Sequence, residues 1–333
     1  MSEPKKVDNY SILIVAKYLQ TSQDYINLVC VCKNFKKTLK KFRYNPIPVH
    51  NTNLFPLMQT QFLYSPYEKR IEDVELYQIC YPVPYHQYLE YQKEGNIKCS
   101  KVYFDQKDAQ KYKENIPEIV HSIGFKTYGD LDCKSFVLPT YITSLEESSF
   151  MRMTDLTSFE LSENLNSLPF GCFQLCFSLK NVIIPTSITS IDPSAFYSCE
   201  KLEEIIIPDS VSYLGYNTFK FCTSLSSVKL PSSLQCVNPD TFYSCLSLKS
   251  IEIPDNVTCI RENAFENCTS LETVKIPLNL KIISLYVFKN CESLTSLYIP
   301  SSCTLIEEGF VLGCTSLKSI QVPLDKYGYY IHI

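Results

Sequence analysis

Cysteine is the residue type in this chain whose number and spacing suggest chemistry. Seven of the 16 cysteines recur at intervals of 23 residues: Cys176, Cys199, Cys222, Cys245, Cys268, Cys291 and Cys314. Neighbouring thiols can form disulfides or hold a metal ion. However, the number of these cysteines is odd, Met153 occupies the preceding slot, and side chains stacked in register run parallel. The pattern therefore favours buried free thiols that act as small hydrophobic side chains.

Free thiols in this number indicate a reducing compartment, because disulfides form and persist in oxidising ones. The apolar run at residues 12–16 is shorter than the roughly 7–15 residues of a secretory signal, and Lys17 closes it. No stretch approaches the roughly 20 apolar residues of a membrane span. We therefore expect a cytoplasmic protein without a membrane span.

No other pattern in the chain indicates catalysis, a cofactor or a metal. With eight glycines there is no glycine-rich loop that could hold a phosphate group. The pair Cys30 and Cys32 has no second pair nearby. The histidines are isolated from one another and from other metal-binding residue types: His50, His86, His121 and His332. We therefore expect no catalytic residues, no cofactor, no metal site and no enzymatic activity.

The spacing of the cysteines belongs to a repeat that runs through more than half of the chain. Prolines close successive 23-residue segments at positions 139, 185, 208, 231, 254, 277, 300 and 323, with Ser162 in place of one. No residue is inserted or deleted across eight segments. A fixed period of this length is typical of a solenoid, in which each coil buries its apolar side against its neighbours.

Each coil, counted from the residue after its proline, carries the same apolar positions. Position 17 is leucine in all eight coils, and position 11 is phenylalanine from Phe150 to Phe288, then Val311 with Phe310 one place early. Positions 20 and 22 are apolar whereas 19 and 21 vary, which predicts a strand with one buried face that ends at the proline. Positions 2–6 predict a second short extended piece, and positions 8–14 a short helical turn. Stacking would join the strands into one parallel sheet.

The repeat resembles the BspA-like branch of the leucine-rich-repeat proteins. Residues 202–211, Leu-Glu-Glu-Ile-Ile-Ile-Pro-Asp-Ser-Val, and residues 195–199, Ala-Phe-Tyr-Ser-Cys, match its pattern closely. The resemblance implies an α/β repeat fold, a leucine-rich-repeat solenoid with a parallel β-sheet on one face. It also implies protein-binding or adhesive roles, not catalysis.

The flanks of the repeats divide the remaining chain. Residues 117–138 look like a degenerate repeat ahead of the eight coils at 139–323, because their first and last segments match a coil. Residues 47–116 are either an irregular cap or degenerate coils, and 61–64 and 101–104 alternate like strands. Residues 324–333 form a C-terminal cap in which Tyr327, Tyr329 and Tyr330 could cover the last coil.

Residues 1–46 predict a small helical domain ahead of the solenoid. Ile12, Val15, Ala16 and Leu19 have helical spacing, Thr21 and Ser22 can cap a second helix at Asp24, and a third helix follows around Phe35. This run resembles an F-box through a set of positions that would contact a Skp1-like adaptor: Leu19, Leu28, Val31 and Phe35. The Leu-Pro that usually opens that motif is absent. A cap whose apolar face packs on the first coils is the alternative.

The distribution of charge bears on the class of partner. Residues 1–45 hold nine Lys or Arg against three Asp or Glu, so they carry +6 and the remainder carries −10, which gives the net charge of −4. A nucleic-acid-binding repeat surface would need the opposite sign. We therefore expect no nucleic acid as the ligand of the coils.

The residue types on the exposed sheet face indicate that its ligand is a protein, of unknown identity. Position 21 places side chains on that face that could contact a partner: Ile183, Ile206, Lys229, Glu252, Lys275 and Tyr298. The isoleucines are neighbouring aliphatics and the tyrosine is an aromatic anchor, whereas the alternating charges could merely stabilise the surface. We therefore expect a non-enzymatic protein-interaction scaffold. The alternatives are an F-box substrate receptor of a ubiquitin ligase and a BspA-like adhesion protein, which would reach the cell surface by unconventional export.

Overall fold

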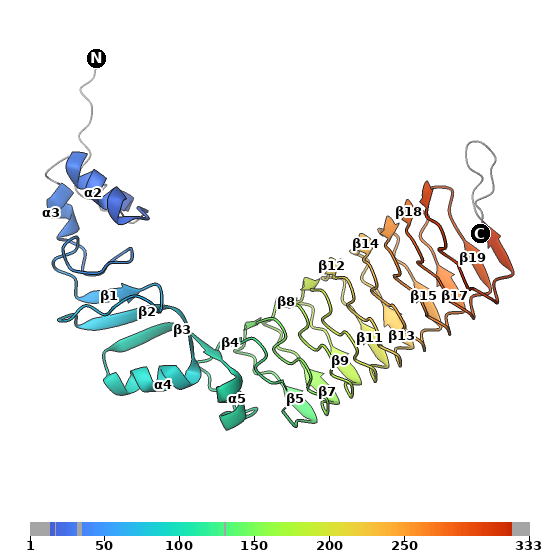
Figure 1. Cartoon of the computed structure of the whole chain (residues 1–333), viewed down its shortest axis with the longest axis horizontal. Helices are drawn as coiled ribbons and strands as arrows, with labels where there is room; N and C mark the ends of the chain where they lie inside the picture. The colour runs from blue at the N-terminus through green and yellow to red at the C-terminus, as the bar shows by residue number, and fades with distance from the viewer. Residues whose placement is uncertain (1–13, 17, 32–34, 130, 322–333) are drawn as a thin grey trace, which may run out of the picture. The chain divides into compact units, whose positions relative to one another are not determined.

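The computed structural model describes residues 14–16, 18–31, 35–129 and 131–321. The chain divides into two compact units, Met1–Tyr103 and Phe104–Ile333 (Figure 1). The expected C-terminal cap, with its three tyrosines, lies outside the described residues, and so do Ile12 and Lys17 of the expected first helix.

The helices at the start of the first unit form where the sequence predicts the second and third. Helix α2 spans Ser22–Val31. The hydroxyl of Thr21 accepts a hydrogen bond from the Asp24 backbone N–H at 3.2 Å, and the Asp24 carboxylate accepts one from the Thr21 backbone N–H at 2.9 Å. This reciprocal capping box satisfies free backbone donors and confirms the expected cap. Helix α3 is a single short turn, Phe35–Leu39.

Aromatic side chains form the core beneath these helices. The Tyr25 ring lies 5.3 Å from the Phe55 ring and 6.5 Å from the Phe42 ring, in both cases edge to face. All three side chains are buried, and the Tyr25 hydroxyl donates a hydrogen bond to the Ala16 carbonyl. The Tyr25 side of α2 is therefore covered within the first unit by the segment that follows the helices.

Three parallel strands follow in the first unit: β1 (Thr60–Leu63), β2 (Leu76–Pro84) and β3 (Ile97–Phe104). They include residues 61–63 and 101–104 of the segments that alternate in sequence, and Tyr64 lies just after β1. Helix α4 (Tyr85–Glu94) connects β2 to β3 and ends at Gly95, whose φ of 79° only glycine adopts without strain. Register partners are 16 residues apart between β1 and β2 and 19 to 20 apart between β2 and β3, so the spacing is shorter and less regular than the 23 residues of a coil.

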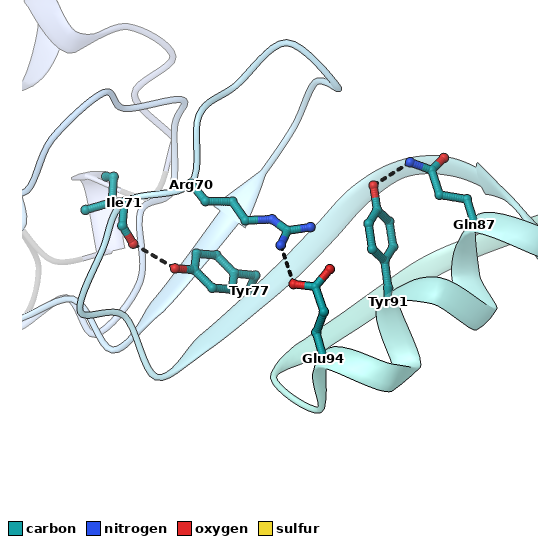
Figure 2. Close-up of polar contacts among 6 residues, drawn as sticks. All are labelled: Arg70, Ile71, Tyr77, Gln87, Tyr91 and Glu94. Atoms are coloured by element: carbon teal, nitrogen blue, oxygen red, sulfur yellow. Dashed lines mark hydrogen bonds and ion pairs between the residues drawn. The ribbon is translucent and has the colours of Figure 1, made fainter.

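A charged and aromatic cluster fastens the loop after β1 to helix α4 (Figure 2). The Arg70 guanidinium lies 5.5 Å from the centre of the Tyr77 ring and 5.3 Å from that of Tyr91, and forms an ion pair with Glu94 at 2.6 Å. Gln87 donates a hydrogen bond to the Tyr91 hydroxyl at 2.5 Å. Because the cation fills the space between both rings, the cluster has a structural role.

The second unit begins with helix α5 (Gln106–Tyr112), and from there a stack of coils carries two arrays of short strands (Figure 1). The first array lies at the end of each coil. Its strands have three residues each: β5 (Ser135–Val137), β7 (Ser158–Glu160), β9 (Asn181–Ile183), β11 (Glu204–Ile206), β13 (Ser227–Lys229), β15 (Ser250–Glu252), β17 (Thr273–Lys275), β19 (Ser296–Tyr298) and β21 (Ser319–Gln321). All pairings are parallel and shifted by 23 residues, as in Glu204↔Ser227. The solenoid and its parallel strands are confirmed.

The second array lies near the start of each coil, where the sequence predicts a second extended piece. Its strands have two residues each: β4 (Ser122–Ile123), β6 (Ser144–Leu145), β8 (Ser167–Leu168), β10 (Ser190–Ile191), β12 (Tyr213–Leu214), β14 (Cys236–Val237), β16 (Cys259–Ile260), β18 (Ile282–Ile283) and β20 (Leu305–Ile306). Residues 117–138 contribute β4 and β5, which pair in register with β6 and β7 of the first full coil.

Neither array is one continuous hydrogen-bonded sheet. The first array divides into β5–β7–β9, β11–β13, β15–β17 and β19–β21, and the second into β4–β6, β8–β10–β12 and β14–β16–β18–β20. Strands of two or three residues share few hydrogen bonds, so a small local shift is enough to interrupt a ladder. The expectation of one uninterrupted sheet is therefore corrected to neighbouring short sheets in the same register.

The helical turn expected at positions 8–14 is wrong. These residues form consecutive turns in which two residues per coil have positive φ, for example Ser194 at 60° and Ser198 at 56°. A helix has no such residues. The backbone N–H groups of Ser194, Phe196 and Ser198 instead donate to carbonyl oxygens of the next coil at 3.0, 3.0 and 2.8 Å. The segment therefore adds a third set of inter-coil hydrogen bonds.

The interior is built as the repeat predicts. The leucines at position 17 from Leu156 to Leu294 and the phenylalanines at position 11 from Phe150 to Phe288 are fully buried. Successive position-11 rings stack with centroids 5.3 to 5.6 Å apart and interplanar angles of 6 to 14°. Each coil thus completes the core of its neighbours.

Gly215 lies where the backbones of two neighbouring coils are too close together to leave room for a side chain. A Cβ added to Gly215 would lie 2.2 Å from the Pro193 nitrogen and 2.5 Å from its Cα. We expect Gly215→Ala to lower the free energy of unfolding by about 1–3 kcal/mol, because the backbone of the preceding coil would have to move. Urea denaturation followed by circular dichroism measures the change. Glu146→Ala at the same coil position is the control, and an equal effect in both variants would contradict the explanation.

Candidate functional site

The solvent-facing residues at position 21 form a row along the first array, which we call the outer row. All six predicted partner-contact residues lie there as the third residue of a strand, from Ile183 on β9 to Tyr298 on β19. Each is exposed, because the residues on either side of it point into the core. Exposure is thus as predicted, whereas binding by these residues stays a prediction.

The first part of the outer row is aliphatic. Ile183 is 79% exposed and Ile206 66% exposed, and Val137 on β5 adds a third aliphatic side chain that is 62% exposed. Glu160 on β7 lies between Val137 and Ile183 in the register of the strands. A shallow hollow of about 670 Å³ runs beside these strands and includes Pro139 and Pro185 in its walls.

Val137 is the residue of this surface that the sequence prediction missed. It precedes Leu138 and Pro139 as Ile206 precedes Ile207 and Pro208, so the signal was present. It was missed because position 21 was followed only through the eight full coils, and the degenerate repeat lies ahead of them.

The middle of the outer row is charged and internally paired. The Lys275 ammonium group forms an ion pair with the Glu252 carboxylate of the adjacent strand. The hydrogen bond and charge of Glu252 raise the pKa of Lys275. Because both side chains are largely exposed, this pair adds little to stability. Lys229 precedes them on β13, and Tyr298 follows on β19. The row therefore has an aliphatic part, a charged part and a single aromatic residue.

The recurring cysteines line the interior as free thiols, which confirms their predicted burial from Cys176 to Cys291. Each thiol donates a hydrogen bond to the carbonyl of the position-11 residue in the preceding coil, at 3.0 to 3.3 Å, as Cys199 does to Phe173. The Phe173 carbonyl also accepts the Cys176 backbone N–H at 3.2 Å. The thiol is therefore a second hydrogen-bond donor to a buried carbonyl oxygen that already accepts a backbone N–H.

Burial keeps reagents away from the recurring thiols from Cys176 to Cys291, which together with Cys314 we call the cysteine ladder. It raises the pKa of Cys176 and Cys268 to about 12, and it raises the pKa of Cys199 and Cys245 well above the usual value. The thiolate is the reactive form of cysteine. At neutral pH the ladder is therefore a structural element and not a candidate catalytic site.

The helices of the first unit border a small apolar hollow of about 170 Å³. Its walls come from α2, α3 and the segment that follows them: Ile26, Val29, Cys30, Leu39, Lys40, Asn53, Leu54 and Pro56. The predicted adaptor contacts are elsewhere. Leu19 and Leu28 are half-buried and do not line the hollow, while the side chains of Val31 and Phe35 lie outside the described part of the structure.

Within the described segments of the chain, no helix combines the length and apolar character that crossing a lipid bilayer requires. Stacked coils with two parallel strands each, a phenylalanine stack and a leucine column define the second unit as a leucine-rich-repeat solenoid. The family model "BspA type Leucine rich repeat region" matches residues 121–246 and 235–330. The chain belongs to this family, whose members are protein-interaction or surface repeat proteins. The resemblance of the N-terminal helices to an F-box stays a hypothesis.

Solved structures agree with this family. A leucine-rich repeat protein from Bacteroides ovatus is 29% identical with a TM-score of 0.58, over 61% of this chain and 53% of that one. The present chain thus spans about half the length of that protein. A leucine-rich repeat protein from Eubacterium ventriosum is 18% identical, covers 88% of this chain and 89% of its own, and has a TM-score of 0.51, which supports the fold alone. No curated protein matches the chain.

Proposed function

We propose that the protein is a non-enzymatic scaffold that binds a protein partner on the outer row of its first strand array. The observation that carries this proposal is the aliphatic part of the row, formed by Val137, Ile183 and Ile206. Three aliphatic side chains exposed on a rigid strand surface are the kind of feature that marks interaction sites. Their removal from water by a partner would supply about 25 cal/mol for each Å² buried.

The remainder of the outer row supports the same surface. Tyr298 offers an aromatic anchor, a residue type enriched among side chains that dominate interface energetics. Lys229, Glu252 and Lys275 present both signs of charge, which would fix the orientation of a partner more than its affinity. The partner contact therefore extends over the aliphatic part, the charged part and Tyr298, with the aliphatic part carrying most of the binding energy.

Affinity purification with the full chain tests the proposal. We expect a triple variant, Ile183→Asp, Ile206→Asp and Tyr298→Asp, to lose the proteins that the unmodified chain captures, while its melting temperature is unchanged. Leu278→Asp is the matched control, because Leu278 is 69% exposed but lies outside the outer row. Unchanged capture by the triple variant would rule out this face as the binding surface.

A second function, recruitment to a ubiquitin ligase through a Skp1-like adaptor, is favoured by the apolar hollow beside α2 and α3. Ile26 and Cys30 are exposed at its border. We expect a pull-down with a Skp1-like adaptor to be lost on Ile26→Asp, whose side chain lines the hollow, and on Leu28→Asp and Phe35→Asp at the predicted contacts. It should be retained on Leu57→Asp, an exposed apolar position of the same unit. Absence of any adaptor in the pull-down of the unmodified chain excludes this function.

A cytoplasmic location is part of the proposal, with surface adhesion as the competing role. The buried free thiols agree with a reducing compartment. Intact cells treated with external protease distinguish the two: we expect the native protein to be protected. Degradation under conditions that leave a cytoplasmic marker intact would favour adhesion after unconventional export.

A further inference from the structure

A second set of aligned cysteines lies outside the ladder. Cys236 is the first residue of β14 and Cys259 the first residue of β16, and the two are register partners in a parallel pairing. Register partners on adjacent strands have Cα atoms about 4.8 Å apart, within the 4.4–6.8 Å range that a disulfide tolerates. Both residues are at position 5 of their coils, on the outer side of the second array.

The environment of this pair differs from that of the ladder. Cys236 is half-buried, and Cys259 is 8% exposed. Burial and a hydrogen bond with the Cys259 thiol raise the pKa of Cys236 to about 12, whereas a hydrogen bond with Arg261 acts in the opposite direction. The pairing of the strands thus places the two thiols side by side, and the Arg261 guanidinium beside Cys236 stabilises its thiolate when it forms.

We propose that Cys236 and Cys259 form a reversible disulfide between adjacent coils when the folded protein meets a low-molecular-weight disulfide such as oxidised glutathione. The Cys236 thiolate attacks one sulfur of the oxidant, which forms a mixed disulfide and releases one glutathione thiolate. The Cys259 thiolate then attacks the Cys236 sulfur and releases the second glutathione. The two thiol protons pass through solvent to the two glutathione products, so the oxidant is reduced and the pair is oxidised.

The same two coils contain a pair that should not react. Cys245 and Cys268 are also one repeat apart, but both are fully buried and each donates its thiol hydrogen to a phenylalanine carbonyl. An oxidant that cannot reach a thiol cannot oxidise it. Because the two pairs have the same spacing and differ in exposure, comparing them shows whether exposure decides which pair reacts.

Peptide mapping without reduction tests the proposal. The folded full chain is incubated with oxidised glutathione, quenched with N-ethylmaleimide and digested with trypsin. Cleavage after Lys229, Lys249, Arg261 and Lys275 places Cys236 and Cys245 in peptide 230–249, Cys259 in 250–261 and Cys268 in 262–275. We expect peptide 230–249 linked to 250–261, lighter by two hydrogen atoms than the two thiol peptides and separated by dithiothreitol.

Two variants make the assignment specific. Cys236→Ser should abolish the link to peptide 250–261, since Cys245 cannot replace Cys236. Adding Ile282→Cys to Cys236→Ser should restore a link at Cys259, because Ile282 is its register partner on the other side. A link to peptide 262–275, or a mixed disulfide with glutathione that persists on Cys236 of the unmodified chain, overturns the proposal.

Discussion

Raising the pH from 7 to 10 is expected to unfold the coil stack without added denaturant. An ordinary cysteine loses its proton near pH 8.5, so the thiols of the unfolded chain ionise first. In the folded chain, burial keeps the pKa of Cys176 and Cys268 at about 12 and that of Cys199 well above its usual value. The folded state therefore binds more protons than the unfolded state above pH 8.5, and stability falls as pH rises.

The expected loss is large because the thiols act together. Each buried thiol removes about 2 kcal/mol of stability at pH 10, from about 1.4 kcal/mol per pH unit. The ladder contributes six fully buried thiols: Cys176, Cys199, Cys222, Cys245, Cys268 and Cys291. Their combined effect of about 12 kcal/mol equals the whole stability of a typical domain.

Urea midpoints measured by circular dichroism at pH 7, 8, 9 and 10 check this prediction. Cys222→Ala should reduce the loss between pH 7 and 10 by about 2 kcal/mol, because it removes one titrating group. Met153→Ala should leave the pH dependence unchanged, because Met153 occupies the same coil position as Cys222 and carries no titrating group. A midpoint that stays constant to pH 10 would mean that the ladder thiols ionise equally in both states.

Much of the solenoid could be predicted because its core residues repeat with one period. Leu202 and Phe219 belong to columns of identical residues spaced by 23, and the position of Ile205 is apolar in every coil. The two columns are fully buried from Leu156 to Leu294 and from Phe150 to Phe288. The alternation of Ile205 and Ile206 between core and solvent follows from strand geometry alone. The fold class and the exposure of the outer row thus required no knowledge of contacts between coils.

The turn segment could not be predicted from the same pattern. Asn217 and Phe221 both have positive φ, at 57° and 63°. Asparagine often adopts this conformation but phenylalanine rarely does, so residue type gave no consistent signal. Hydrogen bonds to the next coil hold Phe221, since its N–H donates to the Tyr243 carbonyl at 2.9 Å. Such bonds depend on the distance between coils, which the sequence does not state.

The candidate surfaces, too, could be predicted from the sequence only in part. Periodicity predicted the exposure of Ile183 and Tyr298, because each occupies a fixed position in its coil. It did not distinguish Cys236 and Cys259 from the ladder thiols, because both sets recur one repeat apart, and only their different surroundings separate them. In the first unit, where no period exists, the hollow beside Ile26 depends on contacts between helices and a loop and left no pattern in the sequence.

Replacing Phe219 with alanine is expected to lower the free energy of unfolding by about 3–5 kcal/mol, the usual cost of truncating a buried phenylalanine. Its ring stacks between those of Phe196 and Phe242, 5.5 Å from each, and is fully buried. The position is far from either end of the stack, so two neighbouring coils lose packing at once. The cavity would lie between rigid rings that the register of the strands holds in place.

Urea denaturation of the variant, followed by circular dichroism, measures this loss. Phe177→Ala is the matched control, because Phe177 is a surface phenylalanine of the same unit. It should change stability by less than about 1 kcal/mol, since surface substitutions usually stay within ±0.5. If both variants lost the same amount, the stacked rings could not be the continuous interior that couples one coil to the next.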